Sequence, residues 1–188
     1  MTHKLVVATG NAHKLEEIRA ILQGWEIISQ RDAGFLGDVE ETGDTFLENA
    51  RLKAWAACKA TGLPTLADDS GLCVDALGGA PGVHSARYSG GGDAENRALL
   101  LKNLQGAENR RASFACVIVV AFPSGKEIVC EGRTYGSILH EERGEHGFGY
   151  DSLFLSDDLK KSFAEASAEE KNGVSHRGRA LKQLKEKL

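Results

Sequence analysis

The chain has 188 residues, of which 41% are hydrophobic and 27% are charged, and its formal net charge is −4. This composition is typical of an ordinary folded domain and excludes a disordered chain. Because no run of Lys or Arg is longer than a pair, the sequence lacks the basic surface of a nucleic-acid-binding protein, and we expect no nucleic-acid partner.

The cysteines and the N-terminus indicate the compartment. The four cysteines include no C-x-x-C pair, which argues against a zinc site or a redox motif and favours reduced, mostly buried thiols. The apolar stretch at residues 5–8 is far too short for a signal peptide or a membrane span. We therefore expect a cytoplasmic protein with no membrane association.

The first half of the chain alternates predicted strands and helices. Continuous apolar runs and an apolar helical face predict a strand at 5–8, a helix that carries Leu15 to Leu22, and a second strand at 25–29. Thr45 and Glu48 form a capping-box pattern, so a helix should run from there to about Thr61, ended by Gly62. A short apolar strand at 64–67 follows.

The second half adds a hairpin. After a loop at 78–82 and an amphipathic helix at 93–104, strands at 113–122 and 127–133 flank a Pro-Ser-Gly-Lys turn. A glycine-rich loop at 144–151, a short strand at 153–155 and two short helices capped by Ser167 and Ser175 complete the chain. A buried hairpin in an otherwise βα chain predicts a mixed sheet.

The most informative feature is the pair Asp68-Asp69, which directly follows the strand at 64–67. Adjacent carboxylates repel each other unless a cation or a shared proton compensates, and α/β proteins keep their chemistry at such strand ends. Glu41 is a third candidate oxygen donor, and this number of carboxylates suits Mg²⁺. The structural alternative is a polar turn in which the Asp side chains cap backbone N–H groups.

The segment Thr9–Lys14 lies where the first strand meets the first helix. Backbone N–H groups and the helix dipole favour an anion there, and Lys14 adds a positive charge. The alternative is an ordinary helix N-cap with a solvated lysine. Lys53, on the second helix, could face the same site or be solvated like most helical lysines.

Two further segments could bind a nucleobase. Phe148 stands between two glycines in the segment 147–151 and could stack on a base, or it could simply pack inward. Near the C-terminus Lys171, His176 and Arg177 gather hydrogen-bond donors within a few residues. A generic amphipathic helix would explain the lysine but not the adjacent His and Arg.

Taken together, the motifs resemble the family of noncanonical purine NTP pyrophosphatases, the inosine/xanthosine triphosphatases that cleanse nucleotide pools. The resemblance spans the whole chain and rests on segments that match in order: Thr9–Lys14, Glu40–Gly43, Phe46–Ala54, Ala67–Leu72, Gly78–Gly82, Ser85–Tyr88, Gly147–Asp151 and Ser175–Gly178. Tyr150 stands where some relatives carry tryptophan, and this difference affects the surface that would stack on the base and not the catalytic residues.

The resemblance implies an α/β fold in which residues 1–188 form a single catalytic domain of two lobes. A long mixed β-sheet and a substrate cleft between the lobes are part of that fold, and a homodimer is the implied assembly. The implied reaction is NTP + H₂O → NMP + PPi on ITP, dITP and XTP, by Mg²⁺-dependent attack of water at the α-phosphate.

Residue roles follow from the same resemblance. Asp69 would accept the proton of the attacking water, and Mg²⁺ would be held by Glu41, Asp68 and Asp69. The implied substrate-binding residues are Thr9, Gly10, Asn11, Ala12, His13, Lys14, Lys53, Ser70, Phe148, Gly149, Tyr150, Asp151, Lys171, His176 and Arg177. Donors such as Arg177 and Lys171 would satisfy the 6-oxo oxygen of hypoxanthine or xanthine and oppose the 6-amino group of adenine.

Two other functions stay open from the sequence. A nucleotide sensor that binds an NTP without turnover would share the anion-binding segment and the stacking ring, but it would not need the acidic set. A related pyrophosphatase for other modified nucleotides, or a phosphatase that releases orthophosphate, would share most of the residues.

Overall fold

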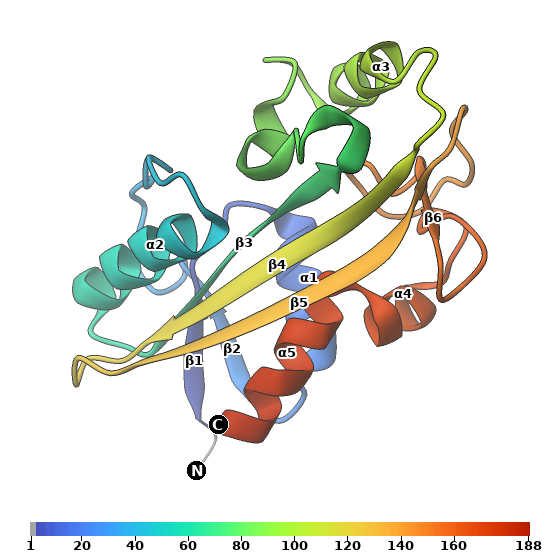
Figure 1. Ribbon diagram of the computed structural model, residues 1–188. Helices are drawn as coiled ribbons and strands as arrows, with labels where there is room; N and C mark the ends of the chain where they lie inside the picture. The colour runs from blue at the N-terminus through green and yellow to red at the C-terminus, as the bar shows by residue number, and fades with distance from the viewer. Residues whose placement is uncertain (1–2) are drawn as a thin grey trace. The chain divides into compact units, whose positions relative to one another are not determined.

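The computed structural model describes residues 3–188, so Met1 and Thr2 of the N-terminal stretch lie outside it. Its sheet has six strands in the order β2-β1-β3-β4-β5-β6 (Figure 1). The strands are β1 (Lys4–Val7), β2 (Glu26–Ser29), β3 (Thr65–Val74), β4 (Arg111–Ala121), β5 (Glu127–Ile138) and β6 (Phe154–Ser156). β1 pairs in parallel with β2 and β3, and β6 is antiparallel to β5. The predicted mixed α/β fold is confirmed.

The chain divides into two compact units. The first comprises the described part of Met1–Asp69 together with Cys116–Gly132 and Ala180–Leu188, and the second comprises Ser70–Ala115 and Arg133–Arg179. Strands β3, β4 and β5 contribute residues to both units. The boundary in β3 falls between Asp69 and Ser70, two residues predicted to belong to the functional site.

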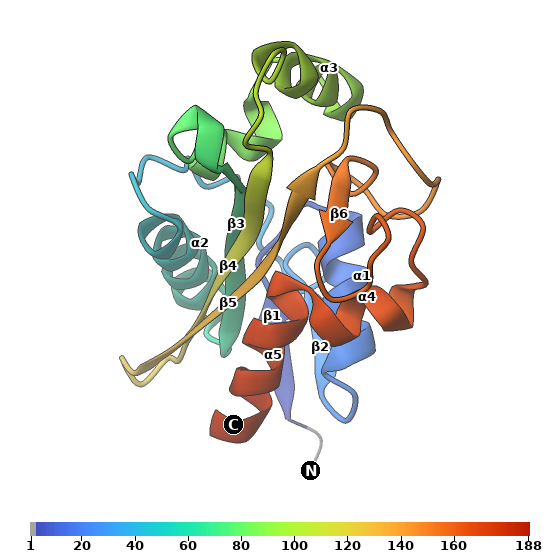
Figure 2. The same ribbon diagram turned by 45° about the vertical axis from the view of Figure 1, so that its right-hand side comes forward.

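The first unit has helices on both faces of its strands, because successive strand residues point to opposite faces. On one face Leu5, Leu66 and Ile118 pack against α1 (Ala12–Ile21) and the end of α5 (His176–Lys187). On the other face Ala8, Ala67 and Val119 pack against α2 (Phe46–Thr61). Figure 2 shows α2 on one side of β3 and α1 on the opposite side.

Local sequence signals explain where α2 begins and ends. The Thr45 hydroxyl accepts a hydrogen bond from the Glu48 N–H, and the Glu48 carboxylate accepts one from the Thr45 N–H, which completes the predicted capping box. Gly62 ends the helix in the left-handed region at φ 68°, a conformation that glycine adopts without steric cost. Alanines at positions 50, 54 and 57 face the sheet, so α2 packs closely against it.

The second unit is built around aromatic rings and leucines. Phe114, Phe154 and Phe163 pack on one another, with centroid separations of 4.6 Å for Phe114–Phe154 and 5.0 Å for Phe154–Phe163. Leu100 and Leu104 join this cluster from α3 (Asp93–Asn103) and its C-cap. Ser167 caps α4 (Ala168–Val174) through a second capping box with Glu170, as predicted.

The structure corrects two element predictions. β3 continues to Val74 and β5 to Ile138, both beyond their predicted ends, because pairing with neighbouring strands extends them past the apolar runs. Two short 3₁₀ helices, Asp75–Leu77 and Gly82–Arg87, flank the loop predicted at 78–82 and were not predicted themselves. All four cysteines carry free thiols, as predicted, and three of them are buried. Between residues 3 and 188, no helix has the length and apolar character needed to cross a bilayer.

Candidate active site

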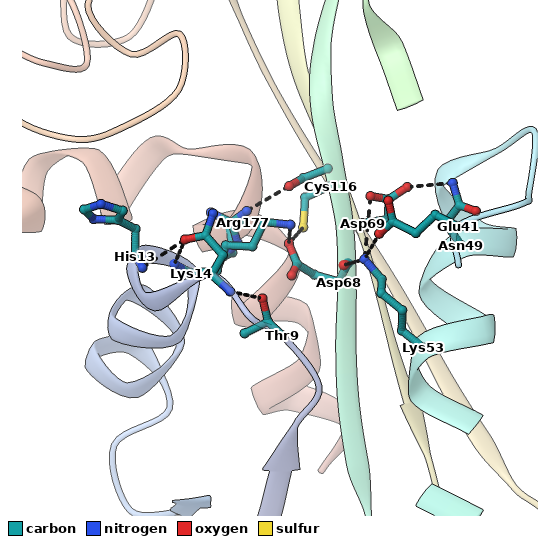
Figure 3. Close-up of polar contacts among 12 residues, drawn as sticks. Thr9, His13, Lys14, Glu41, Asn49, Lys53, Asp68, Asp69, Cys116 and Arg177 are labelled. Carbon is teal, nitrogen blue, oxygen red and sulfur yellow. Dashed lines mark hydrogen bonds and ion pairs between the residues drawn. The ribbon is translucent and has the colours of Figure 1, made fainter. Parts of the chain in front are cut away.

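Asp68 and Asp69 lie within β3 and not in a turn after it, which corrects the sequence prediction. Both side chains are buried, with 1% and 5% of the residue surface exposed. Since neighbouring strand residues alternate between faces, Asp68 shares the α1 face with Leu66, and Asp69 shares the α2 face with Ala67. Figure 3 shows the two carboxylates on opposite sides of the strand.

Asp69 is surrounded by groups from α2 and the loop before it. Asn49 Nδ2 donates to Asp69 Oδ2 at 3.2 Å, and Lys53 Nζ lies 3.8 Å from Asp69 Oδ1. Lys53 Nζ also contacts Glu41 Oε1 at 2.5 Å and donates to the backbone carbonyl of Asp68 at 2.7 Å. Lys53 therefore faces the site, and the solvated alternative does not apply (Figure 3).

Burial and neighbouring charges set the protonation of this cluster. Burial raises the pKa of Asp69, and the Glu41 carboxylate raises it further, while Lys53, Lys14 and the Asn49 hydrogen bond lower it without cancelling the increase. For Lys53, burial lowers the pKa, but the carboxylates of Asp68, Asp69 and Glu41 outweigh burial and raise it overall. The site thus holds a firmly charged lysine beside a carboxylate of increased basicity.

Asp68 has a different set of partners. Lys14 Nζ, at the start of α1, lies 3.2 Å from Asp68 Oδ2, and the Cys116 thiol lies 3.9 Å from the same oxygen. Among residues 3–188 no group of three or more His, Cys, Asp or Glu side chains is arranged to hold a metal ion. The alternation of side chains along β3 turns Asp68 towards Lys14 and Asp69 towards Lys53, and the binding of a metal ion by Glu41, Asp68 and Asp69 stays a prediction.

The segment before α1 forms the N-cap that the sequence left as an alternative. Asn11 Oδ1 accepts hydrogen bonds from the N–H groups of His13 and Lys14 at 3.0 and 3.2 Å, and Thr9 Oγ1 accepts from the Asn11 N–H at 3.1 Å. Residues 10–13 are exposed at this helix start. The cap orders the backbone of the segment, and its affinity for an anion stays a prediction.

The second predicted set belongs to the second unit and is organised by Asp151. The buried Asp151 carboxylate accepts hydrogen bonds from the Phe148 N–H at 3.0 Å and from Lys171 Nζ at 2.7 Å. Lys171 Nζ also lies 4.7 Å from the centroid of the Phe148 ring. A Cβ atom on Gly147, where φ is 76°, would lie 2.2 Å from Asp151 Oδ2, so this turn requires glycine.

The remaining residues of this set have distinct surroundings. Arg177 is buried and donates to Ser70 Oγ at 2.8 Å. The His176 ring stacks on Phe114 at 4.8 Å between centroids, and Tyr150 is buried with its hydroxyl donating to the Ser85 carbonyl at 2.7 Å. Tyr150 thus packs inward and offers no exposed ring, whereas Phe148, beside it in the loop, is only half-buried.

Three residues of functional interest were missed by the sequence assignment. Asn49 contacts Asp69, and its only sequence signal was its place in the Phe46–Ala54 motif. Asp93 Oδ2 accepts from the Gly149 N–H at 2.9 Å, and Arg97 Nη1 donates to the Gly149 carbonyl at 2.9 Å. Both residues lie on α3, more than fifty positions from Gly149, so no local pattern could reveal that they hold the loop of Phe148 in place through these two hydrogen bonds.

Comparison with known protein families identifies the family of this chain. A model of the Ham1 family matches residues 5–187 of the chain. The chain belongs to the Ham1 family. This confirms the resemblance drawn from the sequence motifs.

Relatives of this Ham1-family chain match it over nearly its whole length. The dITP/XTP pyrophosphatase of Haemophilus influenzae is 49% identical over 196 residues, covering 100% of both chains. That of Desulfotalea psychrophila is 50% identical and covers 98% of this chain and 85% of its own. The structure of the Staphylococcus aureus Ham1 protein superposes with a TM-score of 0.88 at 41% identity, covering 97% of this chain and 96% of that one.

Proposed function

We propose that this protein hydrolyses noncanonical purine nucleoside triphosphates, namely ITP, dITP and XTP, to the monophosphate and pyrophosphate. The observation that carries the proposal is the buried Asp69 carboxylate, held between Asn49 and Lys53 in a chain of the Ham1 family. Relatives whose sequences are 49–50% identical to this chain are dITP/XTP pyrophosphatases, which supports this substrate class.

In the proposed reaction Asp69 acts as the general base. It takes a proton from water as the water oxygen forms a bond to the α-phosphorus, and the bond from that phosphorus to the bridging oxygen breaks to release pyrophosphate. Burial raises the pKa of Asp69, which makes the ionised carboxylate a stronger base than an exposed one. A positioned base typically contributes about 10² to 10⁴ to the rate.

The carboxylates beside Lys53 fit a divalent metal ion. Glu41 Oε1 and Asp69 Oδ1 both approach the Lys53 ammonium, so two hard oxygen donors already converge on one cationic group. We propose that Mg²⁺ is held by Asp69 with help from Glu41 and Asp68. When bound, Mg²⁺ would offset the charge that grows on the leaving pyrophosphate.

Positive and polar groups from α1 and α2 would bind the triphosphate. Lys14 and Lys53 supply ammonium groups, and the exposed residues 10–13 lie at a helix start, where the helix dipole favours an anion. Phosphate oxygens would compete with the Asp68 carboxylate for Lys14. The N-cap made by Asn11 keeps the backbone of this segment in place.

The second set would bind the base. Phe148 would stack on the purine, with Gly149 and Tyr150 shaping the loop, and Asp151 would hold Lys171 beneath the ring. Arg177 and Lys171 would donate to the 6-oxo oxygen, with Ser70 and His176 supporting them. Sites built on such polar matching discriminate by about 10⁴ to 10⁵, because the wrong base leaves buried groups unpaired.

The deciding experiment is a product analysis. We expect ITP with Mg²⁺ to give IMP and pyrophosphate in equal amounts, and ATP to react far more slowly. Release of orthophosphate would indicate a phosphatase, and binding without turnover would indicate a sensor. Chelation of divalent ions should abolish the reaction, and turnover that persists with excess chelator would contradict the metal proposal.

Three further proposals come from the sequence and its resemblance to the family. We propose that the protein is a homodimer, that it acts in the cytoplasm, and that residues 1–188 work as one catalytic domain with its substrate cleft between two lobes. Light scattering of the purified protein would measure the oligomeric state. A single cooperative unfolding transition would support one domain, and two separate transitions would contradict it.

A further inference from the structure

Asn49 is a fully buried amide that joins two parts of the proposed catalytic machinery. Its side chain is 0% exposed and lies in the first turn of α2. Its Nδ2 donates to Asp69 Oδ2 at 3.2 Å, and its Oδ1 accepts from the Gly43 N–H at 2.8 Å. Figure 3 shows Asn49 beside Asp69, with Glu41 and Lys53 in the same cluster.

These two hydrogen bonds require an amide. The carboxylate of Asp69 needs a donor and the Gly43 N–H needs an acceptor, and a carboxamide supplies both from one end of a short side chain. Aspartate would keep the acceptor but face Asp69 with a like charge. Leucine, of similar size, would leave both partners without their hydrogen bonds in a buried place.

The bond to Gly43 fixes the loop that carries Glu41. Gly43 follows Glu41 by two residues, and a Cβ atom there would lie 2.5 Å from the Cβ of Glu48 and 2.8 Å from Asn49 Oδ1. The N–H groups of Asp44 and Thr45 also donate to the Glu48 carboxylate, at 2.7 and 3.2 Å. The loop is thus held tightly against the start of α2, and Asn49 is the member of this arrangement that reaches Asp69.

We propose that Asn49 is a positioning residue, which orients the Asp69 carboxylate and holds the Glu41 loop at a set distance from it. The inference rests on the proposed function of Asp69 and Glu41. Asn49 itself takes no part in the chemical step, because its Nδ2 and Oδ1 atoms are both hydrogen-bonded to protein groups. It should therefore influence kcat and metal affinity more than the KM for ITP.

The first test separates kcat from KM. Asn49→Asp keeps the acceptor for Gly43 but loses the donor to Asp69, so we expect kcat for ITP to fall by about 100-fold, the effect of a misplaced catalytic group, while KM changes little. Gly43→Ala disturbs the same hydrogen bonds from the loop side, because its Cβ atom would crowd Asn49 Oδ1. We expect a similar fall in kcat. If both variants fold and keep kcat within about twofold of wild type, the inference is wrong.

The second test measures metal binding without turnover. Mg²⁺ is titrated calorimetrically into nucleotide-free protein, and Asn49→Leu should weaken binding by about 10- to 100-fold, as is typical when a partner of a metal ligand is lost. Unchanged Mg²⁺ affinity in folded Asn49→Leu would overturn the inference. If Asn49→Leu fails to fold, Gly43→Ala takes its place in the titration and decides the question in the same way.

Asn96 provides the matched control. It is also a buried asparagine near the start of a helix, 2% exposed, whose amide accepts from the Ser89 N–H at 2.8 Å and donates to the Ala86 carbonyl at 3.1 Å. Asn96→Leu should lower the melting temperature but leave kcat and Mg²⁺ affinity of the folded protein unchanged. Wild-type protein that releases no pyrophosphate from ITP would refute the proposed function, whereas an active wild type with unaffected Asn49 variants would refute only the role of Asn49.

Discussion

Asp68 and Asp69 are consecutive residues whose carboxylates point to opposite faces of β3, one towards Lys14 of α1 and the other towards Asn49 and Lys53 of α2. The alternation separates the two charges, so the repulsion expected between adjacent carboxylates is relieved by geometry and by a separate lysine on each face. The two residues should accordingly differ in function.

Replacing Asp69 should abolish turnover without harming the fold. We expect Asp69→Asn to lower kcat for ITP by at least about 10²-fold, since the general base is lost. Because the pKa of Asp69 is raised, burial of its ionised form is unfavourable, and the neutral amide should keep or increase the melting temperature. Pyrophosphate release and thermal unfolding are the measurements. Asp68→Asn is the comparison, and it should change KM more than kcat.

Lys14 should bind phosphate at the expense of its pair with Asp68. Lys14→Ala should weaken binding of ITP by about 1.5–3 kcal/mol, the typical strength of a hydrogen bond to a charged group, and affect inosine less. It should also lower stability, since breaking a buried ion pair typically costs about 3–5 kcal/mol. The double variant Lys14→Ala/Asp68→Asn should recover stability but not ITP affinity. Equal losses for ITP and inosine would place Lys14 away from the phosphates.

Arg177 and Phe148 should affect base choice differently. Arg177→Ala should lower kcat/KM for ITP and XTP far more than for ATP, because a donor to the 6-oxo oxygen is lost. Phe148→Ala should penalise every purine triphosphate similarly, by about 1–3 kcal/mol, because stacking does not depend on the identity of the base. The measurement is kcat/KM for ITP, XTP, GTP and ATP in both variants. A uniform decrease in Arg177→Ala would assign this arginine to phosphate and not to base recognition.

Glu127 should make the stability of the first unit depend on acidic pH. Its carboxylate accepts from Arg51 Nε and Nη2 at 2.9 and 2.7 Å and from Trp55 Nε1 at 3.0 Å, and these hydrogen bonds lower its pKa. A lowered pKa in the folded state means that this contribution is present above the pKa of the unfolded chain and is lost as the pH falls through the folded value.

The corresponding measurement is the melting temperature as a function of pH. We expect the wild type to lose more stability than Glu127→Gln between neutral pH and acidic pH, and the fluorescence of Trp55 should change over the same range, because its N–H loses a charged acceptor. Parallel melting curves for the two proteins at all pH values would contradict this assignment. Asp38→Asn, on an exposed loop residue, serves as a control for charge removal alone.

The sequence by itself determined the elements and the family. The Thr45–Glu48 capping box, the left-handed Gly62 and the cap at Ser167 depend on contacts between residues only a few positions apart, so local patterns predicted them correctly. The ordered motifs identified the family without any structure. The true length of β3 could not be predicted in this way, because strand pairing extends it beyond its apolar residues.

Only the tertiary structure decided how the site is arranged. Whether Asp68 faces Lys14 or the other carboxylates depends on the register and length of β3, which packing and pairing determine. Asn49 is hydrogen-bonded to Asp69, which lies twenty residues away in the sequence, and Arg97 is hydrogen-bonded to Gly149, which lies fifty-two residues away. Such contacts form only when separate elements pack together, and no pattern within a single helix or strand encodes them.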